Sequence, residues 1–224
     1  MIELITIPGS TFHMGSQTGA DDERPIYEVF LKPYHIGKFP ITNREFNQFR
    51  TDHPELKLIP LESNFNDPDQ PVTSVSWFDA VAFCEWLRNK TGKLFRLPTE
   101  AEWEFAATAG NQQNIYPWGT RSWNERPELH NIFKNGPVLV GSFEPNAFGI
   151  HDMCINIHEW CSDWYAQDYY SKSPAENPKG PTHGTRRSSR GGSWRHQIKI
   201  TRCAARSSIP PEMRYADYGF RVAI

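Results

Sequence analysis

Residues 96–106 read Arg-Leu-Pro-Thr-Glu-Ala-Glu-Trp-Glu-Phe-Ala and form the most informative part of the chain. They contain a helix start, because Thr99 is a typical N-cap and Glu102, three residues later, can bond back to the Thr99 amide. The same pairing occurs at two earlier positions, Thr42 with Glu45 and Ser76 with Asp79. We therefore predict three helices, each beginning directly after one of these caps.

The second of these helices has the clearest pattern. Trp77, Val81 and Cys84 recur at helical spacing and mark a broad apolar stripe. Gly92 follows as a C-cap and predicts the end of the helix near Thr91.

Outside the helices, short apolar runs alternate with turn residues. Residues 1–40 predict two or three strands, and the C-terminal tail predicts strands at 191–194, 199–206 and 218–223. Residues 110–150 predict loop with short strands. The segments 53–72 and 165–189 predict irregular structure. The pattern indicates an α+β fold with two or three helices, short antiparallel strands and much irregular loop.

The 224 residues contain no long linker, so we expect one domain over 1–224. A net charge of −2 indicates no nucleic-acid partner. A local basic cluster is either a solvated rim or a patch for an anionic ligand. Its members are Arg186, Arg187, Arg190, Arg195, Lys199 and Arg202. The absence of a signal peptide and of an apolar run near 18 residues predicts no membrane partner and a cytoplasmic location. For such a location we expect the four cysteines to be buried and reduced.

Several motifs occur in one order along nearly the whole chain. They are Phe12-His-Met-Gly-Ser16, Val75-Ser-Trp77, residues 96–106, Tyr116-Pro-Trp-Gly119, Asn146-Ala-Phe-Gly149, Asp152-Met153, Glu159-Trp160, Arg190-Gly-Gly-Ser-Trp194 and Gly219-Phe-Arg221. In these motifs the chain resembles the formylglycine-generating-enzyme, or sulfatase-modifying-factor, family. The resemblance implies a C-type-lectin-like fold.

In those enzymes, as the resemblance implies, two cysteines between the Gly-Gly-Ser and Arg-Cys-Ala-Ala-Arg motifs bind copper(I) as thiolates. The matching stretch here, 195–201, contains no cysteine, and other side chains replace soft thiolates poorly. We therefore expect no copper and assign no catalytic residue. Cys203 matches a position of a family disulfide whose partner would fall at Ala107. The partner of Cys84 would fall at Val222, so both family disulfides are absent.

The segment 152–159 matches a calcium loop of the family. By position, the donors are Asp152, the carbonyls of Ile155 and Ile157, and Glu159, and oxygen donors suit calcium. The alternative is that Asp152 and Glu159 only cap turns. Ile155 replaces the usual glycine, which constrains the backbone.

A transition metal is a further alternative. His151 and His158 could bind one together with Cys154, which would make the protein an oxidoreductase with a non-standard metal site. Histidines at the rim of the core are the competing interpretation.

The tail from Arg190 to Val222 also resembles the variable region of retroelement-diversified proteins, in which this fold displays varied binding residues. The matching positions predict a ligand face, and Ser193 within it is also explained by close packing beside Gly191-Gly192. The face consists of Ser193, Trp194, Arg195, His196, Gln197, Lys199, Met213, Tyr215 and Asp217.

The first hypothesis is a non-catalytic domain that binds a peptide, protein or small-molecule ligand. The alternatives are the oxidoreductase with a non-standard metal site and a variable ligand-binding protein of a diversity-generating retroelement. Oligomeric state and ligand identity do not follow from the sequence.

Overall fold

The computed structural model describes residues 2–55, 65–129, 136–195 and 201–224. Within these ranges the chain forms three α-helices and eight short strands joined by long loops, which confirms the predicted α+β class. The helices are α1 (Asn43–Asp52), α2 (Trp77–Thr91) and α3 (Glu100–Thr108). The strands are β1 (Leu4–Ile7), β2 (Ser10–Met14), β3 (Tyr27–Leu31), β4 (Tyr34–Gly37), β5 (His158–Trp164), β6 (Arg187–Arg190), β7 (Arg206–Ile209) and β8 (Tyr218–Gly219).

All three helices begin where the caps predict. In each, the Ser or Thr side chain accepts from the backbone amide three residues later, and the acid returns a bond to the N-cap amide. Helix α2 ends at Gly92, which adopts a left-handed conformation with φ 71° and donates its amide to the Arg88 carbonyl at 2.8 Å. Local chemistry is sufficient to set these boundaries.

The N-terminal segment forms four strands instead of two or three. β1 pairs with β4 and β2 pairs with β3, both antiparallel, so that the inner pair is nested within the outer one. The prediction undercounted because β1 and β2 are separated only by Pro8-Gly9, a connection too short to distinguish from a bend.

The C-terminal half forms a four-stranded sheet in the order β7-β6-β5-β8. β5 pairs antiparallel with β6 and parallel with β8. The strand predicted at 191–194 lies instead at 187–190, because Gly191 and Gly192 have φ of 94° and 63° and end the extended backbone.

Other strand predictions were partly wrong. The strand at 218–223 is confined to 218–219 as β8, and the one at 199–206 falls partly outside the described residues, with β7 beginning only at Arg206. Over 110–150, the described residues form the short 3-10 helices η3 (Trp123–Glu125) and η4 (Pro127–Leu129) and no named strand. Strands this short leave too few alternating positions for a pattern to be read.

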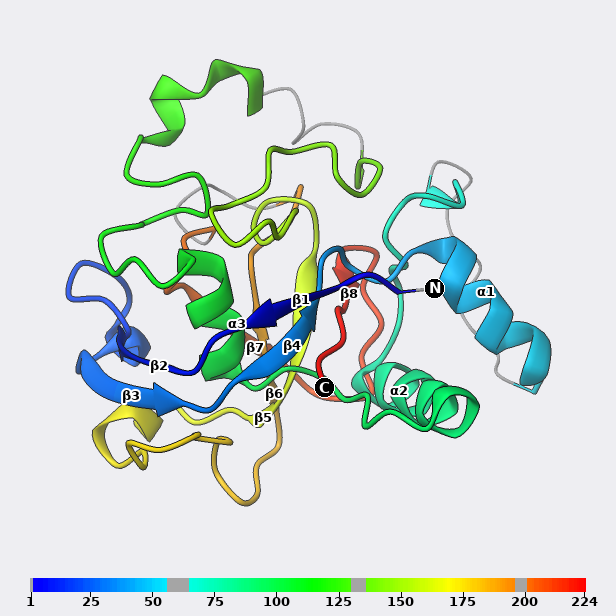
Figure 1. Ribbon diagram of the computed structural model, residues 1–224, viewed down its shortest axis with the longest axis horizontal. Coiled ribbons are helices and arrows are strands. Elements are labelled where there is room, and N and C mark those ends of the chain that lie inside the picture. Colours follow the sequence, from blue (N-terminus) through cyan, green and yellow to red (C-terminus); the bar gives the residue numbers. More distant parts are fainter. Residues whose placement is uncertain (1, 56–64, 130–135, 196–200) are drawn as a thin grey trace.

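Strand β5 separates two hydrophobic cores. Trp160 packs with the aromatic side chains of α1 and α2, whereas its neighbour Cys161 packs with α3 and the N-terminal strands. Successive side chains of a strand point to opposite faces, so one strand contributes to both cores. Figure 1 shows α1 and α2 together on one side of the sheet and α3 on the other. Among the described helices, none has the length and apolarity needed to cross a membrane.

Candidate functional site

Helix α3 is fixed to the C-terminal sheet by buried ion pairs. Glu100 accepts from Arg206 at 2.8 and 3.0 Å and lies 3.3 Å from Arg190 Nε. Arg190 is fully buried and also pairs with Glu104. Burial alone would raise the pKa of Glu100, but the guanidiniums of Arg206 and Arg190 outweigh it and hold the pKa below its ordinary value. The glutamates of the 96–106 motif are therefore structural.

The solvated-rim interpretation is wrong for Arg187, Arg190 and Arg202, whereas Arg186 and Arg195 are exposed and Lys199 lies outside the described residues. Arg187 lies between two rings, with its guanidinium carbon 3.7 Å from the Trp77 centroid and 3.5 Å from that of Trp164. Arg202 pairs with buried Glu23 at 2.6 Å. Several of the arginines therefore hold the fold together through acids and rings far away in the sequence.

The predicted calcium loop places Asp152 and Ile155 in left-handed backbone conformations, with φ of 57° and 84°. Asp152 is buried, and its Oδ2 accepts from the Gly141 amide at 2.6 Å. Its Oδ1 has no hydrogen-bond partner among the described residues. Burial raises the pKa of Asp152 to about 6. An orphaned buried carboxylate oxygen fits a cation ligand.

Glu159, the second predicted acidic donor, does not fit that role in this arrangement. Its Oε2 accepts from Arg221 Nε at 2.6 Å and from Trp103 Nε1 at 2.8 Å, and its Oε1 accepts from Arg221 Nη2 at 2.7 Å. Glu159 and Arg221 are both fully buried. The carboxylate charge is thus already neutralised by a guanidinium.

Ile157 is fully buried, and its carbonyl oxygen lies 3.4 Å from the position that a Cβ on Gly191 would take. Ile155 donates its amide to the Gly191 carbonyl at 3.0 Å. The loop therefore packs against the Gly-Gly turn that ends β6. Close backbone approach is the physical reason for a glycine at position 191.

The residues of the alternative transition-metal site are each engaged elsewhere. His151 Nδ1 contacts the Phe143 carbonyl at 2.8 Å, and the His158 ring stacks on Tyr218 with centroids 4.6 Å apart. Cys154 packs in the α3 core. Across 2–55, 65–129, 136–195 and 201–224, no group of three or more His, Cys, Asp or Glu side chains is arranged to hold a metal.

The structure brings three residues of the predicted ligand face into contact. Ser193 Oγ donates to Asp217 Oδ2 at 2.7 Å, and Arg195 Nη1 lies 3.7 Å from Asp217 Oδ1. Ser193 and Asp217 are buried, whereas the Arg195 side chain is 49% exposed. The Arg195 guanidinium lies 5.6 Å from the Trp194 ring centroid. Of Ser193, Asp217 and Arg195, only Arg195 reaches solvent, and Trp194 beside it is half-buried.

A second part of the predicted face lies on the segment before β8. Met213 is 38% exposed and Tyr215 is 44% exposed. Between them, Arg214 makes two hydrogen bonds to Asp79 at the start of α2, at 2.8 and 2.9 Å. The exposed side chains are therefore carried by an anchored segment. The remaining predicted members, His196, Gln197 and Lys199, lie outside the described residues.

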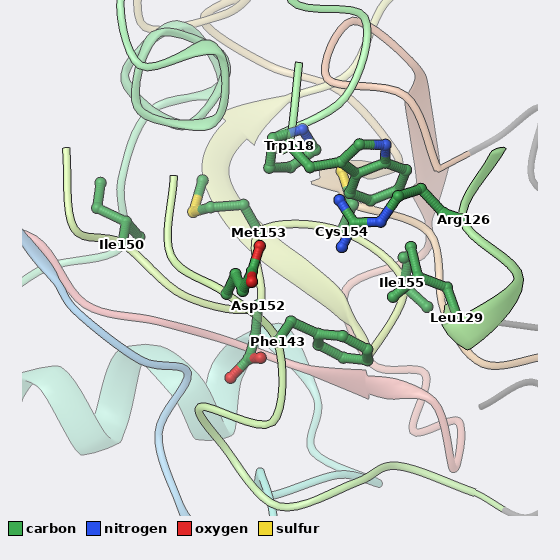
Figure 2. A pocket seen from close by; sticks show the side chains of 11 residues that line it. Trp118, Arg126, Leu129, Phe143, Ile150, Asp152, Met153, Cys154 and Ile155 are labelled. Carbon is green, nitrogen blue, oxygen red and sulfur yellow. The ribbon is translucent and has the colours of Figure 1, made fainter. Parts of the chain in front are cut away.

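A small cavity of about 20 Å³ lies beside the Asp152–Ile155 segment. Figure 2 shows Trp118, Arg126 and Cys154 close together, and Phe143 and Leu129 are among the other residues of the lining. The Arg126 guanidinium lies 5.6 Å from the Trp118 ring centroid, and that ring stacks on Tyr116 with centroids 4.7 Å apart. None of the described members of the predicted ligand face lines this cavity.

Comparison with known proteins identifies the scaffold. The family model of the sulfatase-modifying factor enzyme 1-like domain matches residues 1–224. The chain belongs to this family. A formylglycine-generating enzyme of Thermomonospora curvata is 32% identical over 286 residues, covering 98% of this chain and 92% of that enzyme. Serine/threonine-protein kinase pkn1 of Chlamydia pneumoniae is 35% identical over 243 residues, covering 100% of this chain and 38% of the kinase.

The solved structures confirm the fold. Treponema denticola variable protein 1 superposes with a TM-score of 0.84 at 25% identity, covering 98% of this chain and 94% of that protein. This sulfatase-modifying-factor-like chain therefore resembles both formylglycine-generating enzymes and a variable protein, as its motifs predict.

The four cysteines of this sulfatase-modifying-factor-like domain are all buried, as predicted. Burial raises the pKa of the Cys154 and Cys161 thiols well above the ordinary value, and it raises that of Cys84 to about 12. The neighbouring Cys203 thiol acts on the pKa of Cys154 in the same direction. Sequence reasoning missed this proximity because Cys154 and Cys203 are 49 positions apart and belong to different motifs.

Sequence reasoning also missed two buried ionisable side chains, Arg221 and Asp163. Asp163 is buried beside Glu100, and burial together with that carboxylate raises its pKa to about 8. The available signal for Arg221 was an arginine within the apolar run 218–224, since a charge in such a run requires a buried partner.

Proposed function

We propose that this chain is a non-catalytic member of its family that binds a peptide or protein on the face formed by Arg195, Trp194, Met213 and Tyr215. The observation that carries the proposal is the combination of a retained scaffold with a stretch, 195–201, that lacks both thiols expected of a copper site. Without thiolates, copper(I) loses its preferred ligands.

The state of Ser193 supports the loss of chemistry. Its hydroxyl donates to Asp217, and the same oxygen accepts from the Arg195 amide at 3.3 Å. Ser193 is fully buried. A hydroxyl in this position orders the turn after β6 and is not presented to a substrate.

The chemistry of the exposed side chains supports a macromolecular ligand. Aromatic residues, Met and Arg are the types enriched at protein interfaces, and a few of them supply most of the binding energy. Small-molecule sites, in contrast, are enclosed cavities. A larger cavity, of about 690 Å³, is lined by Tyr34, Arg96 and Asn177 and by no described residue of the proposed face. The resemblance to variable proteins, in which this fold displays binding residues, points in the same direction.

The loss of catalysis is tested with a Cys-Xaa-Pro-Xaa-Arg peptide, the substrate type implied by the enzyme relatives. Purified protein is incubated with copper(I), oxygen and the peptide, and formylglycine is measured by mass spectrometry. We expect no conversion above the protein-free reaction. Conversion that scales with protein concentration would overturn the proposal.

Binding is tested by selecting phage-displayed peptides on the immobilised chain. We expect enriched peptides to lose at least tenfold in affinity on Arg195→Ala and Tyr215→Ala. Phe30→Ala is the matched control, because Phe30 is similarly exposed, at 39%, but lies on β3. Peptides that bind all three variants equally, or a failure to enrich any peptide, would contradict the proposed face.

Calcium enters this proposal as a structural ion only. Asp152, with its orphaned oxygen, is the acidic donor that fits, and nearby backbone carbonyls would complete the shell. The pairing of Glu159 with Arg221 argues against its taking part. When bound, such an ion would neutralise Asp152 and stabilise the loop 152–157.

A further inference from the structure

The cavity of about 690 Å³ is a second place where this chain could hold a ligand. Its lining comes mainly from the turn between β3 and β4, the residues around the start of α3, and the pair Asn177 and Lys179. Sites for small molecules occupy roughly 300–1,000 Å³ and are usually formed before the ligand binds. The volume therefore suits a small organic molecule, in contrast to the exposed face proposed for a peptide.

The wall beside α3 is held by a closed set of hydrogen bonds. Arg96 donates two bonds to the Glu102 carboxylate, both at 2.7 Å, and the Thr99 amide donates to the same group at 2.8 Å. The buried Tyr34 hydroxyl donates to the Glu102 carbonyl at 2.7 Å and ties the start of β4 to the helix. Because Arg96 already neutralises Glu102, this wall is rigid and brings no uncompensated negative side chain to the cavity.

Another part of the wall is fixed through Asn177. Its backbone is left-handed, with φ 44°, and its amide donates to the Phe30 carbonyl at 2.9 Å. Its Oδ1 accepts from the Lys32 amide at 2.8 Å. Its Nδ2 donates to no described residue, which leaves one donor available to a ligand. The same side chain thus holds the residue that follows β3 and offers a polar group to the cavity.

The lining side chains leave two positive charges uncompensated. The cations are Lys32, Arg96 and Lys179, and among the described lining residues the only acidic side chain is Glu102, which is paired with Arg96. Lys32 and Lys179 are exposed and form no ion pair with a described residue. A cleft lined by one sign of charge concentrates ions of the opposite sign. The charges therefore favour an anion that carries two negative charges.

We propose that this cavity binds a small organic phosphate monoester. Such a group carries about −1.5 to −2 charges at pH 7 and has three oxygens that accept strong hydrogen bonds. Three donors are available to it, the ammonium groups of Lys32 and Lys179 and the Asn177 Nδ2. A carboxylate, with a single charge and two oxygens, uses this set less completely. Leu31 and Pro33 supply apolar surface for the organic part of the ligand.

This site is separate from the face proposed for peptide binding. Neither Arg195 and Trp194 nor Met213 and Tyr215 line the cavity. The stretch 195–201, where the family resemblance places the copper thiolates, contributes no described residue to it either. Loss of binding at one site therefore leaves the other intact, and the two proposals can fail independently.

The test is a titration of the nitrogen-15-labelled chain with phenyl phosphate, followed by NMR at pH 7.5 and low ionic strength. Inorganic phosphate supplies the charge without an organic part, and benzoate supplies a ring with one charge. We expect saturable shifts of the Lys32 and Lys179 amides, and at least tenfold tighter binding of phenyl phosphate than of either control. No saturable shift, shifts centred on residues 213–218, or equal affinity for a control would overturn the proposal.

Two variants remove the proposed charges one at a time. Lys32→Met and Lys179→Met keep the apolar stem of the side chain and lose the ammonium group. Each should weaken phenyl phosphate binding about tenfold, because a hydrogen bond between charged groups contributes more than a neutral one. Lys93→Met is the matched control, since Lys93 is also exposed but does not line the cavity. Equal affinities in all three variants would contradict the site.

Asn177→Asp separates the donor to the ligand from the bond that holds the wall. An Asp oxygen can still accept from the Lys32 amide, so the anchor is kept. The change replaces the Nδ2 donor by an oxygen and adds a negative charge, so phenyl phosphate binding should be lost. Binding that survives in this variant would overturn the proposal. The tripeptide Gly-phosphotyrosine-Gly binding tenfold tighter than phenyl phosphate would reassign the site from a small molecule to a phosphorylated peptide.

Discussion

The Arg221 guanidinium donates two hydrogen bonds to the Glu159 carboxylate, at 2.6 and 2.7 Å, where both side chains are fully buried. Arg221 also donates to the Gly37 and His151 carbonyls, each at 2.9 Å. One side chain from the C-terminal tail therefore connects β5, the end of β4 and the loop before Asp152. Because Trp103 also donates to Glu159, the pair links α3 to the rest of the fold.

Replacing Arg221 with Met should therefore destabilise the protein severely. The substitution leaves the Glu159 charge buried without its cation, and breaking one partner of a buried pair costs about 3–5 kcal/mol. Urea unfolding followed by tryptophan fluorescence measures the loss. The double variant Glu159→Gln with Arg221→Met removes both charges and should recover part of the stability. Equal losses in the single and double variants would show that the charge pairing is not the cause.

The sequence allowed helix starts to be predicted because capping is local. Ser76 and Asp79 meet within one turn, so their spacing is sufficient. Strand β5 was not predicted. Five of its seven residues, His158 to Cys161 and Asp163, are buried, so buried and exposed positions do not alternate along it. A strand buried on both faces has no period of two to detect.

The candidate site was predictable in part, because motif positions in the sequence point to residues that lie together in the fold. Motif positions brought Ser193, Arg195 and Asp217 into one set, and the structure places them in contact. Which carboxylate pairs with which guanidinium is a property of the folded core. Glu159 therefore looked like a free oxygen donor in the sequence, although in the structure Arg221 occupies it.

Asp163 should make stability depend on pH in an unusual direction. Its pKa is about 8 in the folded protein, against about 3.9 for an unperturbed Asp. Between these values the folded state holds a proton that the unfolded state has released, so its contribution to stability falls as pH rises, by up to about 1.4 kcal/mol per pH unit. Below pH 4 the contribution is complete, and above pH 8 it is lost.

The Asp163→Asn variant tests this pH dependence. An Asn oxygen can still accept from the Glu100 amide and the Ser162 hydroxyl, which contact Asp163 Oδ2 at 3.0 Å. Other titrating groups are common to both proteins and cancel in the comparison. Unfolding free energies measured from pH 5 to 8 should shift progressively in favour of the variant. A difference that stays constant over this range would contradict the raised pKa.

The Arg214–Asp79 pair should control the order of the proposed ligand face. Removing the guanidinium in Arg214→Ala frees the segment that carries Met213 and Tyr215 from α2. Because the Arg214 side chain is 31% exposed, the global stability loss should stay near 1 kcal/mol or below. Hydrogen exchange should rise in residues 210–216 and remain unchanged in β5. Exchange that rises equally in both would indicate general destabilisation instead of local release.

Arg24→Ala is the control for that experiment. Arg24 forms an exposed pair with Asp21 in the N-terminal half, away from the segment 210–216. It should change neither the hydrogen exchange of 210–216 nor peptide binding, whereas Arg214→Ala should weaken any peptide selected on the wild-type face. Unchanged affinity in Arg214→Ala would mean that Met213 and Tyr215 do not contribute to binding.

Calcium should bind weakly, because one carboxylate in place of two lowers the charge available to the ion. With Asp152 as the acidic donor and Glu159 paired to Arg221, we expect a dissociation constant of about 0.1–1 mM, the range of weak calcium sites. Titration calorimetry at pH 7.5, with magnesium as the competing ion, measures it. Asp152→Asn should abolish the heat, whereas Asp168→Asn, a change at an exposed acid in a surface pair with Lys172, should not. Submicromolar binding would require Glu159 to leave Arg221 and join the ion, and would overturn the arrangement of charges on which this expectation depends.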